Sequence, residues 1–221
     1  MVATPIGNLG DITFRAVETL KNVDVVACED TRRTLRLLTH FGIKKPLVSC
    51  RAHNESAAAR KLLALLDEGK TAAYASDAGT PCVSDPGAVL ADCVREGGHT
   101  ITPIPGVSAW TALASAAGEI GKTVIFEGFL PLKGAKRDAR LQSLMETGYA
   151  VALYESPFRA VKLLRAIADI DNMRRVVVGR ELTKLHEEIL QAPAKEAAEI
   201  FAGREKIMGE FSVLLAGVKK R

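Results

Sequence analysis

The stretch Ser76-Asp77-Ala78-Gly79-Thr80-Pro81-Cys82-Val83-Ser84-Asp85-Pro86-Gly87 decides the fold of the first half of this chain. It follows a small apolar run at 71–75, which is typical of a buried strand, and it consists almost wholly of turn-forming residues. We expect Asp85 to cap a helix whose first position is Pro86. The loop exceeds the usual length of about two to six residues, and in open α/β sheets such loops bind ligands at the carboxyl ends of strands. The stretch therefore predicts a ligand site, with a solvated surface turn as the alternative.

Length and composition favour one large or two small globular domains. The 221 residues are 48% hydrophobic and 25% charged, which is enough apolar material for a buried core. No apolar run approaches the roughly 20 residues that span a bilayer, and no signal segment opens the chain, so we expect a cytoplasmic protein without a membrane partner. The four cysteines show no CxxC spacing and are expected to be reduced. A net charge of +4 permits a nucleic-acid partner.

The first half alternates strand-like and helical patterns. Strands are expected at 23–28, 46–50, 71–75 and 100–104, and helices at 31–41, 55–68 and 107–117. Asp30 and Asn54 are placed to cap the first two helices, and a glycine follows each of those helices. This order predicts a mostly parallel sheet covered on both faces.

The second half repeats the alternation and then gathers strands. Strands are expected at 124–129, 150–155, 175–182, 188–191 and 211–218, and helices at 136–146, 158–169 and 193–201. The clustering predicts a mixed sheet with antiparallel members. Gly118 and Gly121 break the chain between the halves, so we predict two α/β domains, 1–117 and 118–221, with a cleft between the two lobes.

Several familiar catalytic motifs are missing from the sequence. The chain has neither GxGxxG after a strand nor GxxxxGK[ST], so it lacks the usual phosphate cradles of dinucleotide-binding and P-loop proteins. It also has no HExxH and no GxSxG, which argues against zinc hydrolysis and triad hydrolysis. We expect no metal site.

Polar segments rich in Gly and Pro remain, each at the carboxyl end of an expected strand. They are TPIGNLGDIT (4–13), ACEDTRRT (27–34), HNE (53–55), SDAGTPCVSDPG (76–87), IPGVSA (104–109), GFLP (128–131), YESPFR (154–159) and RELTK (180–184). Together and in this order they closely resemble the ribosomal small-subunit RNA methyltransferase I family of the tetrapyrrole methylase superfamily, over nearly the whole chain. The resemblance implies S-adenosylmethionine-dependent methylation of a cytidine ribose 2′-hydroxyl in the decoding region of 16S ribosomal RNA. It also implies a homodimer of two-lobed chains with the cofactor in the cleft.

Two departures from the family pattern concern the ends of the chain. The family usually opens with several apolar residues before TPIGN, whereas only residues 1–3 precede Thr4 here, so we expect a short first strand. Many relatives continue into a Lys-rich C-terminal segment, whereas this sequence stops at Lys219-Lys220-Arg221. We expect weaker RNA affinity than in those relatives.

The resemblance assigns the cofactor to three kinds of residue. They are the acceptor Asp77, with the small residues Ala78, Gly79 and Thr80; the helix-start residues Ser108 and Ala109; and the apolar residues Pro5, Leu130 and Leu182. Small residues allow close backbone approach, free helix N–H groups suit a carboxylate, and an apolar slot suits adenine. The alternatives are a simple helix cap for Ser108 and an ordinary core position for Leu182.

A general base for the 2′-hydroxyl is harder to identify. His53, Asp30 and Glu155 are the candidates, with Glu29 also considered and a slight preference for His53. Glu155 could equally form a salt bridge to Arg159. Alignment of the reacting groups alone can contribute about 7 to 11 kcal/mol.

Basic residues indicate where RNA would bind. Arg32 and Arg33, near Arg36 at one helix start, are expected to hold phosphates, and Asn54 is a further substrate candidate whose alternative is a helix cap. A second basic stretch contains Lys133, Lys136, Arg137 and Arg140, with a solvated helix face as the alternative. Trp110 is expected in the core rather than as a stacking platform.

Two other functions remain open from the sequence. The same fold can methylate carbon on a tetrapyrrole, but those enzymes typically open with a GxGPGD loop where this chain has TPIGNLGD. A non-catalytic RNA-binding or ribosome-assembly protein could also retain such loops, and saturable S-adenosylmethionine binding would argue against it.

Overall fold

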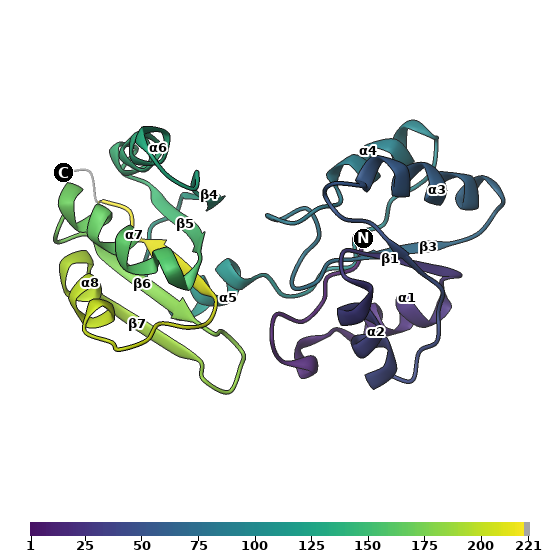
Figure 1. Ribbon diagram of the computed structural model, residues 1–221, viewed down its shortest axis with the longest axis horizontal. Coiled ribbons are helices and arrows are strands. Elements are labelled where there is room, and N and C mark those ends of the chain that lie inside the picture. Colours follow the sequence, from purple (N-terminus) through teal and green to yellow (C-terminus); the bar gives the residue numbers. More distant parts are fainter. Residues whose placement is uncertain (219–221) are drawn as a thin grey trace. The chain divides into compact units, whose positions relative to one another are not determined.

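The computed structural model describes residues 1–218 and contains two compact units (Figure 1). Unit 1 runs from Met1 to Ser108, and unit 2 begins at Ala109. The boundary predicted after residue 117 lies beyond helix α5 (Ala109–Ala116), which packs against strands of unit 2. The α/β class predicted from the sequence is confirmed. Lys219, Lys220 and Arg221 lie outside the described residues.

Unit 1 is built on a parallel sheet of three strands in the order β2-β1-β3. The strands are β1 (Val25–Cys28), β2 (Leu47–Ser49) and β3 (Ala72–Ala75). Val2 extends the sheet through isolated parallel bridges to Ala75 and Ile104. The expected strand at 100–104 is thus reduced to one bridge at Ile104, which pairs with Val2.

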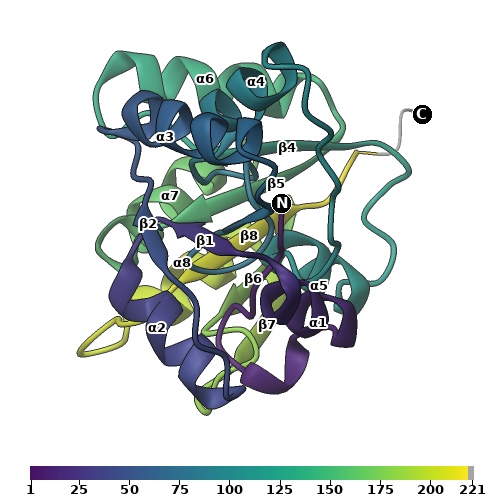
Figure 2. The same ribbon diagram turned by 90° about the vertical axis from the view of Figure 1, so that its right-hand side faces the viewer.

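Helices cover both faces of the unit 1 sheet, as predicted (Figure 1). The helical elements are η1 (Leu9–Asp11), α1 (Phe14–Asn22), α2 (Thr31–His40), α3 (Glu55–Asp67) and α4 (Ala88–Glu96). Val26 faces the α1 and α2 side, whereas its strand neighbours Val25 and Ala27 face α3 and α4. Helices α3 and α4 run side by side, as Figures 1 and 2 both show. Both faces of the strands are therefore apolar, as a doubly covered parallel sheet requires.

Two of the expected helix caps differ from the structure. Asp30 caps α2 as predicted, accepting a hydrogen bond from the Arg32 N–H at 2.9 Å. Asn54 lies at the N-cap position of α3 but makes no capping bond, because its side chain bonds the backbone of Arg51 and Ser49 instead. The predicted Asp85 cap is wrong: α4 begins at Ala88, two residues after Pro86, with Gly87 at its N-cap.

Unit 2 contains the predicted mixed sheet, with strand order β4-β5-β8-β6-β7. The strands are β4 (Val124–Phe129), β5 (Ala150–Glu155), β6 (Arg175–Arg180), β7 (Glu188–Pro193) and β8 (Phe211–Leu215). Among the described strands of this sheet only β4 and β5 pair in parallel, because β8 inserts antiparallel between β5 and β6. The carboxyl ends of β4 and β5 therefore lie at one edge of the sheet.

Three helices of unit 2 share one core with the sheet. They are α6 (Ala135–Glu146), α7 (Pro157–Ile170) and α8 (Ala194–Ala202). Ser156 caps α7 by accepting from the Phe158 N–H, and Pro157 takes the first helical position, where its missing N–H costs nothing. Leu163, Leu164 and Phe201 are fully buried in this core.

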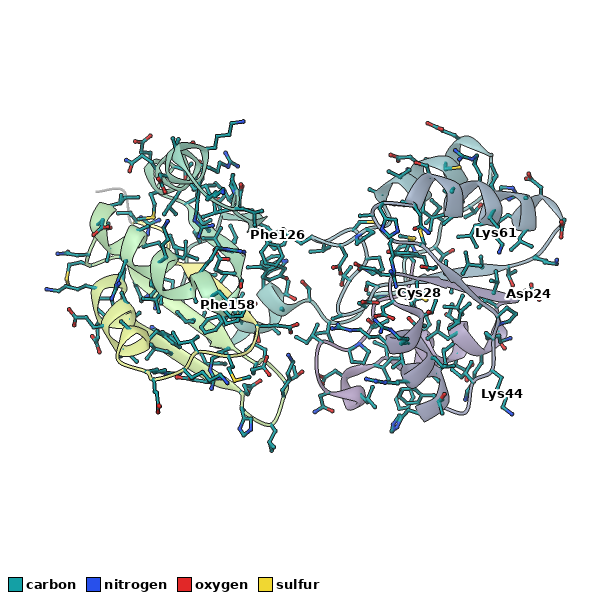
Figure 3. All side chains as sticks on the ribbon, in the orientation of Figure 1. Asp24, Cys28, Lys44, Lys61, Phe126 and Phe158 are labelled. Atoms are coloured by element: carbon teal, nitrogen blue, oxygen red, sulfur yellow. The ribbon has the colours of Figure 1, made fainter. Side chains whose placement is uncertain are left out.

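No helix within residues 1–218 is both long enough and apolar enough to cross a bilayer. The four cysteines are free thiols. Cys28, at the end of β1, is wholly buried, which raises the pKa of its thiol (Figure 3).

Candidate active site

Hydrogen bonds tie the motif loops of unit 1 into one edge, which we call the unit 1 rim: residues 4–8, 28–34, 76–87 and 104–108. The Thr4 N–H donates to the Gly79 carbonyl and the Gly79 N–H to the Thr4 carbonyl, each at 2.9 Å. The Thr80 hydroxyl donates to the Val107 carbonyl at 3.0 Å. The Asp30 N–H donates to Asp77 Oδ1 at 2.8 Å, which joins the loops after β1 and β3. The structure thus joins on one edge the segments that the sequence placed at the carboxyl ends of strands and expected to gather there.

The loop after β3 has the unusual backbone of a binding loop. Gly79 has a φ of 89°, a backbone conformation that residues with a side chain rarely adopt, so glycine fits this turn. Cys82 and Ser84 also have positive φ values, 66° and 65°, which non-glycine residues rarely adopt. The other two such residues within 1–218, Glu181 and Thr183, lie in the RELTK motif of unit 2. Strained backbone of this kind clusters at functional sites.

Asp77 and Asp30 are both anchored, but differently. One Asp77 oxygen bonds the Asp30 backbone, and the other lies 3.9 Å from Arg33 Nε. The Asp30 carboxylate accepts from Nε and Nη2 of the Arg32 guanidinium and also from the Arg32 backbone N–H that it caps. These bonds keep the pKa of the Asp30 carboxyl well below its usual range. Asp30 is therefore a weak proton acceptor, which argues against the general-base role considered from the sequence.

Two further carboxyls of the rim show the opposite behaviour. Burial, followed by the charges of Glu29 and Asp77, raises the pKa of Asp85 to about 7. Burial and then the Asp77 charge raise the pKa of Glu29, against the lowering effects of Arg33 and Arg51. The rim thus holds three mutually repelling acids, Glu29, Asp77 and Asp85.

The remaining unit 1 candidates occupy varied environments. Pro5, Gly79 and Ser108 are buried, and Ala78 and Thr80 are half-buried. His53 is exposed on the turn before α3, next to Asn54, whose amide bonds the backbone of Ser49 and Arg51 ahead of that turn. The Asn54 side chain is thus committed locally, which weakens its candidacy as a substrate contact.

Glu155, the third base candidate, is enclosed in unit 2. Its carboxylate accepts from Arg137 Nη2 at 2.5 Å, from Arg159 Nε at 2.8 Å and from the Ser156 N–H at 2.8 Å, and its side chain is 1% exposed. The salt bridge to Arg159 that we considered as an alternative is present. This arrangement is that of a structural ion pair.

The other unit 2 candidates are mostly core residues. Leu130 and Leu182 are buried, and Ala109 is the half-buried first residue of α5. Their cofactor roles remain predictions.

The expected second basic stretch is partly wrong. The Arg137 side chain is buried against Glu155, and Arg140 is paired with Glu127 at 2.5 Å. Each arginine is neutralised by a glutamate distant in the sequence, 18 residues away for Arg137 and 13 residues away for Arg140. The lysines of this stretch, Lys133 and Lys136, are exposed.

Sequence reasoning missed the roles of three residues in or beside the rim: Asp85 within it, Glu55 at the start of α3 and Tyr74 in β3. It assigned Asp85 to a helix cap, and it did not single out Glu55 or Tyr74. A partial signal was available, because Glu55 follows His53 and Asn54 in the HNE motif, at the start of an alanine-rich helix.

Comparisons with known proteins agree with this geometry. Residues 1–198 match the family of tetrapyrrole (corrin/porphyrin) methylases. A ribosomal RNA small subunit methyltransferase I from Borrelia garinii is 43% identical over 98% of this chain and 97% of its own length. The protein of the same name from Thermotoga maritima is 44% identical, with the same coverage of both chains.

The chain belongs to the ribosomal RNA small subunit methyltransferase I family. It is therefore a methyltransferase, with S-adenosylmethionine as the methyl donor. A solved structure of a cobalt precorrin-4 methyltransferase superposes with a TM-score of 0.72 at 20% identity, over 98% of this chain and 92% of that one. This last similarity shows that the methyltransferase I family shares its fold with tetrapyrrole methylases.

The residues of the unit 1 rim fit this donor. A sulfonium and an ammonium are cations, and the rim acids Glu29 and Asp77 supply negative charge, while glycine at position 79 puts no side chain between its backbone and a ligand. The hydroxyl of Tyr74 is buried and has no hydrogen-bond partner among the described residues, so it is free to bond a polar ligand atom.

Proposed function

We propose that this enzyme methylates the ribose 2′-hydroxyl of a cytidine in the decoding region of 16S ribosomal RNA, within the small ribosomal subunit. The unit 1 rim carries the proposal, because it joins four unit 1 motifs of the family resemblance into one bonded edge, to which the HNE motif is attached through the Gly87 N–H bond to Glu55. The near full-length similarity to proteins named small subunit methyltransferase I supports the RNA substrate.

The loop after β3 would hold the methyl donor. Asp77 has one carboxylate oxygen that no backbone group occupies, and Gly79 and Thr80 present backbone close to a ligand. The bound donor supplies an electrophilic methyl group. The protein must hold that group in line with the ribose oxygen, and such alignment can contribute about 7 to 11 kcal/mol.

The start of α2 would engage the RNA backbone. The side chains of Arg32 and Arg33 are 81% and 60% exposed, although each lies near an aspartate. Asp30 fixes the Arg32 guanidinium, which leaves the outer N–H groups directed at solvent or a phosphate. An ordered arginine loses less conformational entropy on binding than a free one.

Label transfer from S-adenosylmethionine tests the proposed reaction class. We expect labelled methyl groups to enter small ribosomal subunits that lack this modification, and no label to enter a tetrapyrrole precursor under the same conditions. Label in the tetrapyrrole alone would establish the alternative function. Cofactor binding with transfer to neither acceptor would contradict both.

The resemblance also implies a homodimer, and the sequence composition predicts a cytoplasmic location; both belong to this proposal. Phe14 and Phe158 are more than nine-tenths exposed, so each unit has apolar surface available for a partner. Light scattering of the purified protein tests the dimer: a monomer mass at micromolar concentration would contradict it.

A further inference from the structure

The acids of the unit 1 rim suggest a proton acceptor that the sequence analysis did not consider. Glu29 follows β1, and Asp77 and Asp85 lie in the loop after β3. The Asp30 N–H bond to Asp77 holds these two loops together, and the charges of Glu29 and Asp77 both act on Asp85. The three carboxyls therefore form one cluster at the carboxyl ends of neighbouring parallel strands.

Asp85 is available in this cluster because another residue caps α4. The buried carboxylate of Glu55 accepts from the Gly87 N–H at 2.9 Å and from the Leu90 N–H at 3.1 Å. Glu55 therefore serves the start of α4, which is the role that the sequence had predicted for Asp85. Within residues 1–218, neither a hydrogen-bond donor nor a cation contacts the Asp85 carboxyl. Burying an ionised carboxyl without a hydrogen-bond or charge partner lowers the stability of the fold, which suggests that this residue has a functional use.

The Tyr74 hydroxyl gives a second, independent indication of a ligand. Tyr74 is 3% exposed, and its hydroxyl has no partner among the described residues. Burial and the nearby charges, including those of Glu29 and Asp85, raise its pKa, so this hydroxyl lies among the same acids. The acids and the hydroxyl together would suit a ligand rich in hydrogen-bond donors, such as a ribose diol. The described residues contain no group of three or more His, Cys, Asp or Glu arranged to hold a metal ion.

The other base candidates are less suited to take a proton. Arg32 engages both oxygens of Asp30. Two arginines and a backbone N–H enclose Glu155. His53 is exposed, so it remains the alternative that the experiment must separate from Asp85.

We propose that Asp85, with Glu29 beside it, accepts the proton of the ribose 2′-hydroxyl during methyl transfer. This inference rests on the proposed function. The ribose oxygen forms a bond to the methyl carbon as the carbon–sulfur bond breaks, and the electron pair of that bond stays on sulfur. The hydroxyl proton passes to the Asp85 carboxylate, and water then removes it.

The electrostatic environment matches Asp85 to this task. A base works best when its pKa lies near the working pH, and that of Asp85 is about 7. Glu29 and Asp77 raise it, and Arg33 and Arg51 act on Glu29 in the opposite direction. Because the two acids titrate together, removing the Glu29 charge should move the Asp85 titration to lower pH.

The first measurement uses the free protein, without donor or RNA. Nuclear magnetic resonance of isotope-labelled aspartate carboxyls should show one group titrating near pH 7. That signal should be absent in Asp85→Asn and should move to lower pH in Glu29→Gln. An Asp85 signal that titrates at an ordinary aspartate pH of about 4 would overturn the proposal.

The second measurement is the pH dependence of single-turnover methyl transfer to small subunits. The wild-type rate should rise with pH, reach half of its maximum near pH 7 and level off above it. Asp85→Asn should lose this dependence and at least about 100-fold in rate while still binding S-adenosylmethionine. Glu29→Gln should move the rise to lower pH, and Asp92→Asn, which changes a 71% exposed carboxyl on α4, should match the wild type.

The outcomes distinguish failure of the proposed methyl transfer from failure of the role proposed for Asp85. A wild-type protein that transfers no methyl to subunits would contradict the proposed function itself. A wild type that transfers methyl, with Asp85→Asn keeping the wild-type rate and pH profile, would overturn only the role of Asp85. Loss of the pH dependence in His53→Gln but not in Asp85→Asn would assign the proton to His53.

Discussion

Replacing Glu155 by glutamine should destabilise unit 2 strongly, because the carboxylate neutralises a buried arginine. The Arg137 side chain is 4% exposed and donates to Glu155 and to the Pro131 carbonyl. Glutamine preserves the shape of the side chain but removes its charge. Arg137 would then be a buried cation without a counterion.

The size of the effect follows from this burial. Removing one partner of a buried ion pair costs about 3 to 5 kcal/mol, whereas an exposed pair contributes about 1 kcal/mol or less. Glu155 also loses part of its bonding to Arg159, whose side chain is 30% exposed and which should add little. We therefore expect Glu155→Gln to lower the free energy of unfolding of unit 2 by about 3 to 5 kcal/mol.

Urea denaturation followed by tryptophan fluorescence measures this loss. Trp110 is the only tryptophan of the chain and belongs to unit 2, where its ring stacks on Phe126 at 5.7 Å. The matched control is Arg140→Ala, which breaks the more exposed pair with Glu127 and should cost about 1 kcal/mol or less. Adding Arg137→Met to Glu155→Gln should recover stability, because it removes the uncompensated charge.

One result would refute this reasoning about Glu155. If Glu155→Gln stays within about 1 kcal/mol of the wild type while methyl transfer falls about 100-fold or more, Glu155 acts in catalysis and not in folding. A double variant less stable than Glu155→Gln alone would show that the unpaired Arg137 charge is not the source of the loss.

Four further predictions follow from the unit 1 rim. Asp77→Ala should weaken S-adenosylmethionine binding by about tenfold or more in calorimetry, because it removes a charged acceptor; unchanged titration would remove Asp77 from the site. Arg32→Ala should weaken RNA binding in filter assays and lower the slope of log affinity against log salt by about one, while cofactor binding stays intact; an unchanged salt slope would contradict a phosphate contact. Glu55→Ala should lower thermal stability by about 2 kcal/mol through two orphaned N–H groups, whereas Glu55→Gln, which keeps one acceptor oxygen, should lose less, and equal losses would argue against the cap. Folding raises the pKa of Asp85, so its unfavourable contribution to stability develops as pH rises from about 4 to about 7. Asp85→Asn should therefore be more stable than the wild type by about 1 to 2 kcal/mol near pH 8, after discounting for partial exposure, and similar to it near pH 4; equal stability at both pH values would contradict the raised pKa.

Local sequence patterns predicted much of the fold because the deciding interactions are local. The bounds of β4 and β5 match the expected 124–129 and 150–155, since short apolar runs between turn residues define buried strands. Asp30 caps α2 as expected because cap and helix start are sequence neighbours.

The differences arise where residues distant in sequence compete for the same role. Glu55 displaces Asp85 as the partner of the α4 start from 32 residues away. Glu155 draws Arg137 into the core from 18 residues away, so a residue expected to face RNA became structural. No local pattern contains such pairings. Which charged residues are paired and which are left unpaired could therefore be determined only from the tertiary structure.

Nucleoside analysis of the RNA product tests the central claim most directly. Small subunits that lack the modification would be incubated with the enzyme and labelled S-adenosylmethionine, and their RNA digested and separated by chromatography with mass spectrometry. The account predicts that the label is recovered as 2′-O-methylcytidine from 16S ribosomal RNA. Label on a base, or on the ribose of another nucleoside, would contradict it.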